Sequence, residues 1–197
     1  MIAWINFIIL LIATFLTGYL YINSVRPVAL SQEIGDAAWR KSERYRRISI
    51  VTMSITVINY IIYYFYPLPL PLARTFSWSW AVSIIIGFVI LIPATYLLIR
   101  GSKDAGEETL KPRPDHKMYG GIYQTMRHPQ AAGESVTWLG GAFLLNSPFL
   151  VLYSLLWLPI YYLMCRAEEK DLLLRFGQEY GEYMQRVGFL WPKKRQE

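Results

Sequence analysis

Long apolar stretches separated by short charged segments constrain this chain more strongly than any other feature of its sequence. A helix needs about 20 predominantly apolar residues to cross a bilayer. Of all residues, 54% are hydrophobic and only 17% are charged, less than an ordinary soluble domain carries. The sequence therefore predicts an all-α integral membrane protein with about five transmembrane helices. The stretches concerned cover residues 2–22, 48–66, 76–99, 131–145 and 149–165.

The last two apolar stretches predict a helical hairpin. The 131–145 stretch spans only about 22 Å at the helical rise, so it barely crosses the bilayer or does not cross it. The Asn-Ser-Pro turn at 146–148 leads into the 149–165 stretch. No polar linker divides the chain, so we expect residues 1–197 to form a single membrane domain.

The lysines and arginines predict how the chain is oriented. Six of the 20 lie in residues 23–47, six in residues 100–130 and seven in residues 166–197. If all five stretches cross, only Arg74 falls on the opposite side. Because positive charge is enriched on the cytoplasmic side, we expect the N-terminus outside and the C-terminus in the cytoplasm. Anionic lipid headgroups are plausible partners, whereas basic residues that only flank helices disfavour nucleic-acid binding.

The three basic segments differ in character. The 23–47 segment is typical of a short interfacial helix. The 100–130 segment is a long loop in which Gly120 and Gly121 allow backbone conformations closed to other residues. The segment after residue 165 is an amphipathic helix whose apolar stripe, extended backwards from Leu172, reaches Glu169 and not Glu168. We therefore expect Glu169 to point inward.

Charged residues at the membrane boundary are the candidate functional groups. Glu134 stands about one turn inside an apolar helix, where a carboxylate is costly unless it is paired or solvated. The hairpin returns the chain to the same surface, so this group could meet Arg127, His128, Glu168 and Glu169. Two adjacent glutamates repel each other, which a cationic or zwitterionic ligand would relieve. With one cysteine and two well-separated histidines, we expect no metal site.

These residues form a pattern that resembles a known family. The pattern is Gly121-Ile-Tyr123, Arg127-His128-Pro129, Gly133-Glu134, Glu168-Glu169, then Phe-Gly-Gln-Glu-Tyr-Gly-Glu-Tyr and Pro192. It is similar to the integral-membrane methyltransferases, which include isoprenylcysteine carboxyl methyltransferases and phospholipid methyltransferases. The likeness covers about residues 95–192. The apolar stretches predict three N-terminal helices within 1–99, which match the family only as apolar segments. The resemblance implies a catalytic region at 100–197, with a cytoplasmic cofactor-binding loop and C-terminal helix.

The resemblance implies that S-adenosylmethionine is the methyl donor. No Gly-x-Gly-x-x-Gly motif follows a strand, so a Rossmann-type cofactor site is not expected. The acceptor would be lipophilic, with an isoprenylcysteine carboxylate preferred over a phospholipid amine or a small thiol. The cofactor-binding residues would be His116, Gly121, Tyr123, Arg127, His128, Glu168 and Glu169, and the catalytic residues Arg127, His128 and Glu134.

The need for a catalytic base and the source of the aromatic wall both depend on the acceptor site. An amine acceptor would need a base, Glu134 or His128, whereas a carboxylate acceptor would not. The family tyrosine two residues after the motif proline is Ala131 here, so either the site is wider or Tyr119 or Tyr123 supplies its aromatic wall. We also expect a lateral opening beside the short 131–145 helix.

A membrane scaffold that has lost the chemistry is the non-enzymatic alternative, and absence of cofactor binding would support it.

Overall fold

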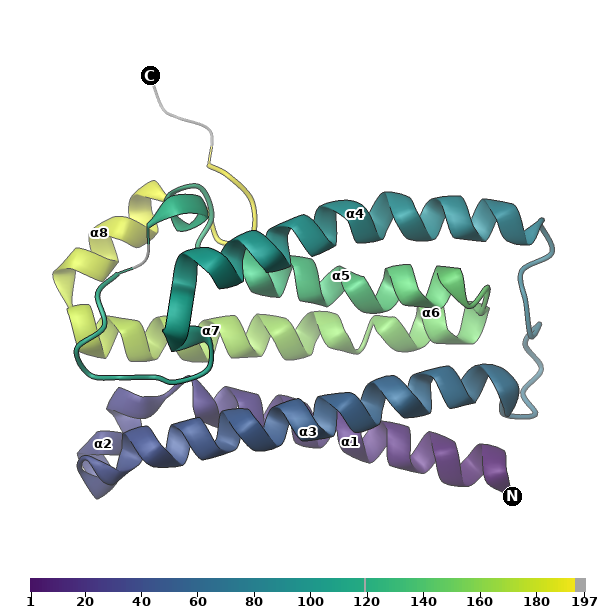
Figure 1. Ribbon diagram of the computed structural model, residues 1–197, viewed down its shortest axis with the longest axis horizontal. Coiled ribbons are helices and arrows are strands. Elements are labelled where there is room, and N and C mark those ends of the chain that lie inside the picture. Colours follow the sequence, from purple (N-terminus) through teal and green to yellow (C-terminus); the bar gives the residue numbers. More distant parts are fainter. Residues whose placement is uncertain (119, 194–197) are drawn as a thin grey trace.

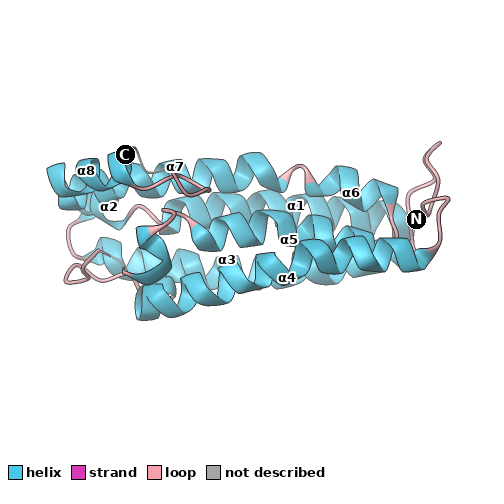
Figure 2. Cartoon of the chain, turned by 90° about the horizontal axis from the view of Figure 1, so that it is seen from above, coloured by secondary structure: helices cyan, strands magenta, loops and turns pink. Residues whose placement is uncertain are grey.

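A computed structural model describes residues 1–118 and 120–193, which form helices, turns and loops without a strand. Figure 1 shows the long helices lying side by side in one elongated bundle, and Figure 2 shows the same bundle from above. The predicted all-α membrane fold is confirmed. The helices are α1 (Ile2–Ser24), α2 (Pro27–Ile34), α3 (Ala37–Phe65), α4 (Trp80–Ala105), η1 (Gly106–Thr109), η2 (Gly121–Gln124), α5 (Pro129–Leu144), α6 (Pro148–Ser154), α7 (Trp157–Phe176) and α8 (Gln178–Arg186).

Four segments of the described chain are long and apolar enough to cross a membrane: Ile2–Ser24, Ala37–Phe65, Trp80–Thr109 and Pro148–Phe176. The fifth predicted span corresponds to α5, whose 16 residues fall short of that length. The outer face of α4 carries the apolar stripe that a lipid-facing helix needs. Its most exposed side chains recur every three or four residues and are Ile85, Val89, Ile92, Tyr96 and Ile99.

Glycines hold α4 and α5 together. A Cβ added to Gly133 would lie 2.4 Å from the Ala94 carbonyl oxygen, and one added to Gly140 would lie 2.6 Å from Leu91. Small residues at such positions let two backbones approach closely, which is a common source of helix association in membranes. This packing places the N-terminus of α5 against the last turns of α4, where Gly101 faces Gln130.

Polar side chains join α1 to α3 and to α6. The hydroxyl of Thr17 donates to Thr52 across 2.7 Å, and the amide of Asn6 donates to the Asn59 carbonyl across 3.0 Å. Thr14 and the Tyr153 hydroxyl lie 2.6 Å apart. Buried polar groups in an apolar surrounding are costly unless they are hydrogen-bonded, so these bonds fix how α1 and α3 pack.

Helix boundaries follow glycine and proline. Gly35 and Gly177 adopt positive φ angles of 62° and 57°, and they end α2 and α7. Pro159 has no N–H for the Leu155 carbonyl, which explains why α6 and α7 are two helices where the sequence predicts one. Residues 37–47 contain neither glycine nor proline, so they extend α3 instead of belonging to a separate interfacial helix.

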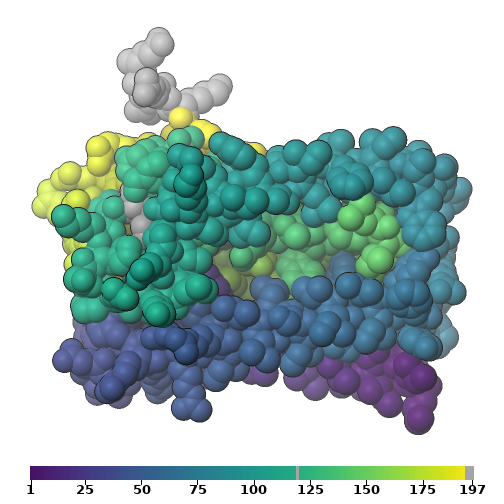
Figure 3. All heavy atoms as spheres, in the orientation of Figure 1, coloured from purple at the N-terminus to yellow at the C-terminus, as the bar shows by residue number. Residues whose placement is uncertain are grey.

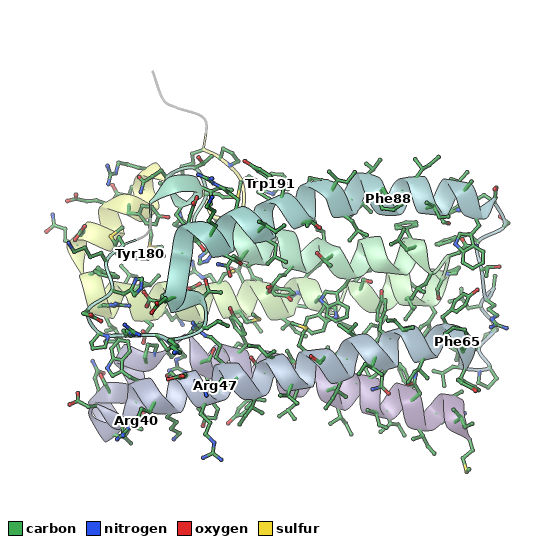
Figure 4. The ribbon with its side chains drawn as sticks, viewed as in Figure 1. Arg40, Arg47, Phe65, Phe88, Tyr180 and Trp191 are labelled. Atoms are coloured by element: carbon green, nitrogen blue, oxygen red, sulfur yellow. The ribbon has the colours of Figure 1, made fainter. Side chains whose placement is uncertain are left out.

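The three basic segments lie together at one end of the bundle, as the sequence predicts. Arg40 lies at the end that carries Tyr180 of α8, and Phe65 lies at the opposite end (Figure 4). The ends of α1, α4 and α7 and the starts of α3 and α5 meet there, whereas Met1 lies at the other end (Figure 1). The candidate site is built from these converging helix ends.

Candidate active site

The residues before α5 are fixed by the C-terminal segment. Met126 and Gly188 form an isolated parallel bridge. The backbone N–H of Arg127 donates to the Gly188 carbonyl across 2.8 Å, and that of His128 donates to the Phe189 carbonyl across 3.2 Å. The chain after α8 therefore returns to the start of α5 and holds Arg127 and His128 in place.

Arg127 and Glu169 form the centre of a buried ion-pair cluster. Arg127 Nε donates to Glu169 Oε1 across 2.7 Å, and its Nη1 donates to the carbonyls of Met184 and Val187. Arg166 Nη1 donates to Glu169 Oε2 across 3.0 Å. The side chain of Glu169 is only 2% exposed. It points inward, as the apolar stripe predicts, but it is occupied there by cationic partners of the protein itself.

His128 lies between the two glutamates. Its Nδ1 is 3.3 Å from Glu168 Oε2, and its Nε2 is 3.3 Å from Glu169 Oε1. Burial would lower the pKa of His128, but hydrogen bonds with Cys165, Glu168 and Glu169 raise this pKa well above its ordinary value. In the protonated form, both ring nitrogens of His128 can donate to these carboxylates.

The loop between α4 and α5 is tied down by Glu108. Its carboxylate accepts from Arg175 Nη1 and pairs with His116 Nδ1, each across 2.7 Å. Gly121, at φ 60°, forms the turn that lets the Ile122 N–H donate to Asp104 across 2.7 Å, and a side chain there would collide with that carboxylate. His116 and Gly121 therefore shape the loop.

One cavity extends from the converging helix ends toward the interior of the bundle. It contains about 560 Å³ of empty space, part of which is open to solvent. Glu134 and Tyr161 both line its inner part. Its wall also includes Tyr21 and Arg46 from the N-terminal helices, and Ala131 at the position of the family tyrosine.

A second cavity adjoins the first on the side of α8. It contains about 400 Å³ of empty space, part of which is open to solvent. Half of its lining residues are apolar or aromatic, and the other half are charged or histidine. The apolar and aromatic ones are Met118, Tyr123, Leu172, Phe176, Tyr180 and Tyr183. Burial raises the pKa of Tyr180 and Tyr183, so both phenols stay neutral. The two cavities share one wall, and the residues that line both are Glu108, Tyr123, Arg127, His128 and Glu168.

Five of the predicted site residues thus line the two cavities, and three do not. Those that line the cavities are Tyr123, Arg127, His128, Glu134 and Glu168. His116, Gly121 and Glu169 do not line either of them. Tyr119, one of the two tyrosines considered for the aromatic wall, lies outside the described residues. Within the described ranges, no group of three or more His, Cys, Asp or Glu residues could hold a metal ion.

Sequence reasoning missed Arg46, Glu108 and Tyr161. Arg46 belongs to a basic segment that is typical of a surface helix, yet its side chain is buried. Glu108 is a charged loop residue with no motif around it. Tyr161 stands in an apolar stretch, where its position one turn before Cys165 was the only signal that it faces the same site.

Comparisons with known proteins give one match. The model of the phospholipid methyltransferase family matches residues 81–179. This segment runs from α4 into α8 and contains Tyr123, Arg127, His128, Glu134 and Glu168, but not Tyr21 or Arg46. A search among curated proteins found no match, and a search among solved structures found none.

Proposed function

The chain belongs to the phospholipid methyltransferase family, and from this premise we propose that it transfers a methyl group from S-adenosylmethionine to a lipid acceptor at the membrane interface. The observation that carries the proposal is the pair of adjoining cavities with a shared polar wall. One contains the aromatic rings of Phe176, Tyr180 and Tyr183 and lies at the end of the bundle with the charged loops. The other reaches a carboxylate on a helix within the bundle.

The second cavity suits S-adenosylmethionine by the chemistry of its lining. Tyr180, Tyr183 and Phe176 offer aromatic faces and edges to an adenine ring, as ligand pockets commonly do. Glu168 stands on the shared wall with its side chain 33% exposed, so it has capacity to accept hydrogen bonds from the amino group or the ribose hydroxyls. Glu169 has less such capacity because it is 2% exposed and already accepts from Arg127, Arg166 and His128.

Glu134 is the residue best suited to the acceptor. When an acceptor nitrogen bonds to the methyl carbon of S-adenosylmethionine, the carbon–sulfur bond breaks, its electron pair stays on sulfur, and a neutral thioether leaves. An amine is protonated near neutral pH, so it must first lose a proton. A Glu134 carboxylate oxygen can bind the ammonium group and accept that proton. The geometry therefore supports an amine-bearing phospholipid best.

An isoprenylcysteine carboxylate is the second candidate acceptor, because the sequence motifs resemble both branches of the family. A carboxylate needs no base, but placing it beside Glu134 would bring two negative charges together. Methyl transfer from labelled S-adenosylmethionine to phosphatidylethanolamine and to a farnesylated cysteine, compared on the same protein, distinguishes the two acceptors.

The acceptor chain has a route from the bilayer to Glu134. Figure 3 shows a hollow between α3 and α4 in which the side chains of α5 are visible. Withdrawing a lipid chain from the bilayer costs about 0.8 kcal/mol per exposed methylene, so access from the side is strongly favoured. We propose that the lipid reaches the first cavity through this hollow, while the methyl donor arrives from the soluble side.

The same proposal orients the protein, with the basic end of the bundle in the cytoplasm. Cysteines placed at the exposed positions Lys111 and Ser77, in a Cys165→Ser background, lie at opposite ends of the bundle. We expect a membrane-impermeant thiol reagent added outside intact cells to label Ser77→Cys and to leave Lys111→Cys unlabelled. Labelling of Lys111→Cys instead would reverse the orientation.

Glu168→Gln is expected to weaken binding of S-adenosylmethionine about 10- to 100-fold, the value of one charge-assisted hydrogen bond. Calorimetric titration of the detergent-solubilised protein measures this, with Glu179→Gln on the exposed face of α8 as the matched control. The sequence favours Glu169 as the ligand of S-adenosylmethionine, whereas this proposal assigns that role to Glu168. Unchanged affinity in Glu168→Gln would remove Glu168 from the proposed cofactor site.

A further inference from the structure

Arg46 is a buried cation whose partners are all neutral. Its side chain comes from α3 and lines the first cavity, and the residue is 7% exposed. Four hydrogen bonds lead from its guanidinium to uncharged oxygens, namely the carbonyls of Glu108, Thr109 and Ser24 and the hydroxyl of Ser24. Among the described residues, no carboxylate forms an ion pair with it. A guanidinium has five N–H groups, so one donor remains for a ligand.

The same cavity also contains a carboxyl group without a cationic partner. Glu134 lines the cavity together with Tyr161, and no lysine or arginine of the described chain forms an ion pair with it. No ion pair joins Arg46 and Glu134 across the cavity. Arg127, by contrast, is neutralised by Glu169, and His128 lies between two carboxylates. The cavity thus presents one guanidinium without an anionic partner and one carboxyl group without a cationic partner, separated by empty space.

Unpaired charges inside a low-dielectric site are costly, and a ligand of opposite charges relieves that cost. A headgroup with a phosphodiester and an amine a few bonds apart is such a ligand. We propose that Arg46 binds the phosphate of the acceptor phospholipid and thereby sets acceptor specificity, while Glu134 receives the amine. Arg46 lies outside the segment that matches the family, so this role belongs to the N-terminal helices of this chain. The inference rests on the proposed function and names the acceptor group that Arg46 recognises.

The test compares two acceptors that share an amine and a long chain but differ in the phosphate. Dioleoyl phosphatidylethanolamine and oleylamine are supplied in mixed micelles, and initial rates are measured with labelled S-adenosylmethionine. Arg46→Gln is expected to lower kcat/KM for the phospholipid about 10- to 100-fold, mainly through KM, because one charge-assisted contact is lost. The rate with oleylamine is expected to stay nearly unchanged.

Two controls separate recognition from structure. Arg47→Gln removes a neighbouring arginine whose side chain is 68% exposed, and it is expected to behave as the wild type. Arg46→Lys keeps the charge without the planar fork, so its loss of phospholipid turnover should be intermediate. If Arg46→Gln does not fold, Arg46→Lys provides the comparison. Retention of radiolabelled phosphatidylethanolamine by each purified variant gives a binding readout that does not depend on turnover.

The outcomes separate this inference from the proposed function. Equal losses with both acceptors, or a parallel loss of S-adenosylmethionine affinity, would mean that Arg46 acts only by holding residues 108 and 109. A wild-type protein that shows no preference for the phospholipid, or that methylates farnesylated cysteine alone, would overturn the role of Arg46 while leaving methyl transfer intact. Absence of S-adenosylmethionine binding by the wild type would instead overturn the proposed function.

Discussion

Arg127→Gln is expected to lower the free energy of unfolding by about 3–5 kcal/mol, as breaking a buried ion pair commonly does. The substitution leaves Glu169 buried with weaker partners and removes the donor from the carbonyls of Met184 and Val187. Because those carbonyls lie at the end of α8 and in the segment after it, the C-terminal segment should detach from the start of α5. Denaturant unfolding of the detergent-solubilised protein, followed by tryptophan fluorescence, measures the change.

Arg166→Gln is the matched control for this prediction. Arg166 contacts the same carboxylate from the other side, but its side chain is 47% exposed. Exposed ion pairs contribute about 0–1 kcal/mol, so this variant should lose little stability. Equal destabilisation by the two substitutions would contradict the assignment of Arg127 as the buried anchor. So would a stable Arg127→Gln protein whose only defect is lost binding of S-adenosylmethionine.

Glu134→Gln is expected to lower turnover of phosphatidylethanolamine about 10²- to 10⁴-fold, the usual contribution of a positioned general base. The affinity for S-adenosylmethionine should stay nearly unchanged, because Glu134 lines only the first cavity. Glutamine keeps the size of the side chain and one oxygen that accepts hydrogen bonds, so the structure should be preserved. Single-turnover rates and calorimetry on the same preparation separate the two effects.

The pH dependence of this variant identifies the role of Glu134. An amine loses its own proton as pH rises, so turnover by Glu134→Gln should recover with increasing pH more steeply than wild-type turnover. Glu182→Gln, on the exposed face of α8, is the control for loss of one carboxylate. Wild-type turnover in Glu134→Gln, or a parallel loss of S-adenosylmethionine affinity, would contradict an acceptor-side role.

Most of the fold can be predicted from local features of the sequence. Apolar runs predict α1, α3 and α4, and the glycine at 177 ends α7 where its conformation requires it. The break between α6 and α7 was missed because proline near the start of a helix is favourable, while its effect on the preceding turn depends on where the helix begins. The sequence predicts an interfacial helix for residues 37–47 because they are charged, but they form the first turns of the membrane helix α3.

The candidate site was predictable only in part, since it depends on contacts between distant segments. Helical phase indicated that Glu169 points inward, but not that Arg127, Arg166 and His128 would occupy it there. Arg46 contacts Glu108, which lies 62 residues further along the chain. No local sequence pattern at either residue predicts this contact. Motifs identify groups capable of chemistry, whereas tertiary packing decides which of them face a cavity and which hold the structure together.

The central claim is that this protein moves a methyl group from S-adenosylmethionine to the amine of a phospholipid. The most direct test incubates purified wild-type protein with methyl-labelled S-adenosylmethionine and phosphatidylethanolamine in mixed micelles, then measures label in the extracted lipid. We expect label to accumulate in N-methylated phosphatidylethanolamine and to depend on Glu134. A protein that binds S-adenosylmethionine, yet labels no phospholipid under conditions in which farnesylated cysteine is methylated, would contradict this account.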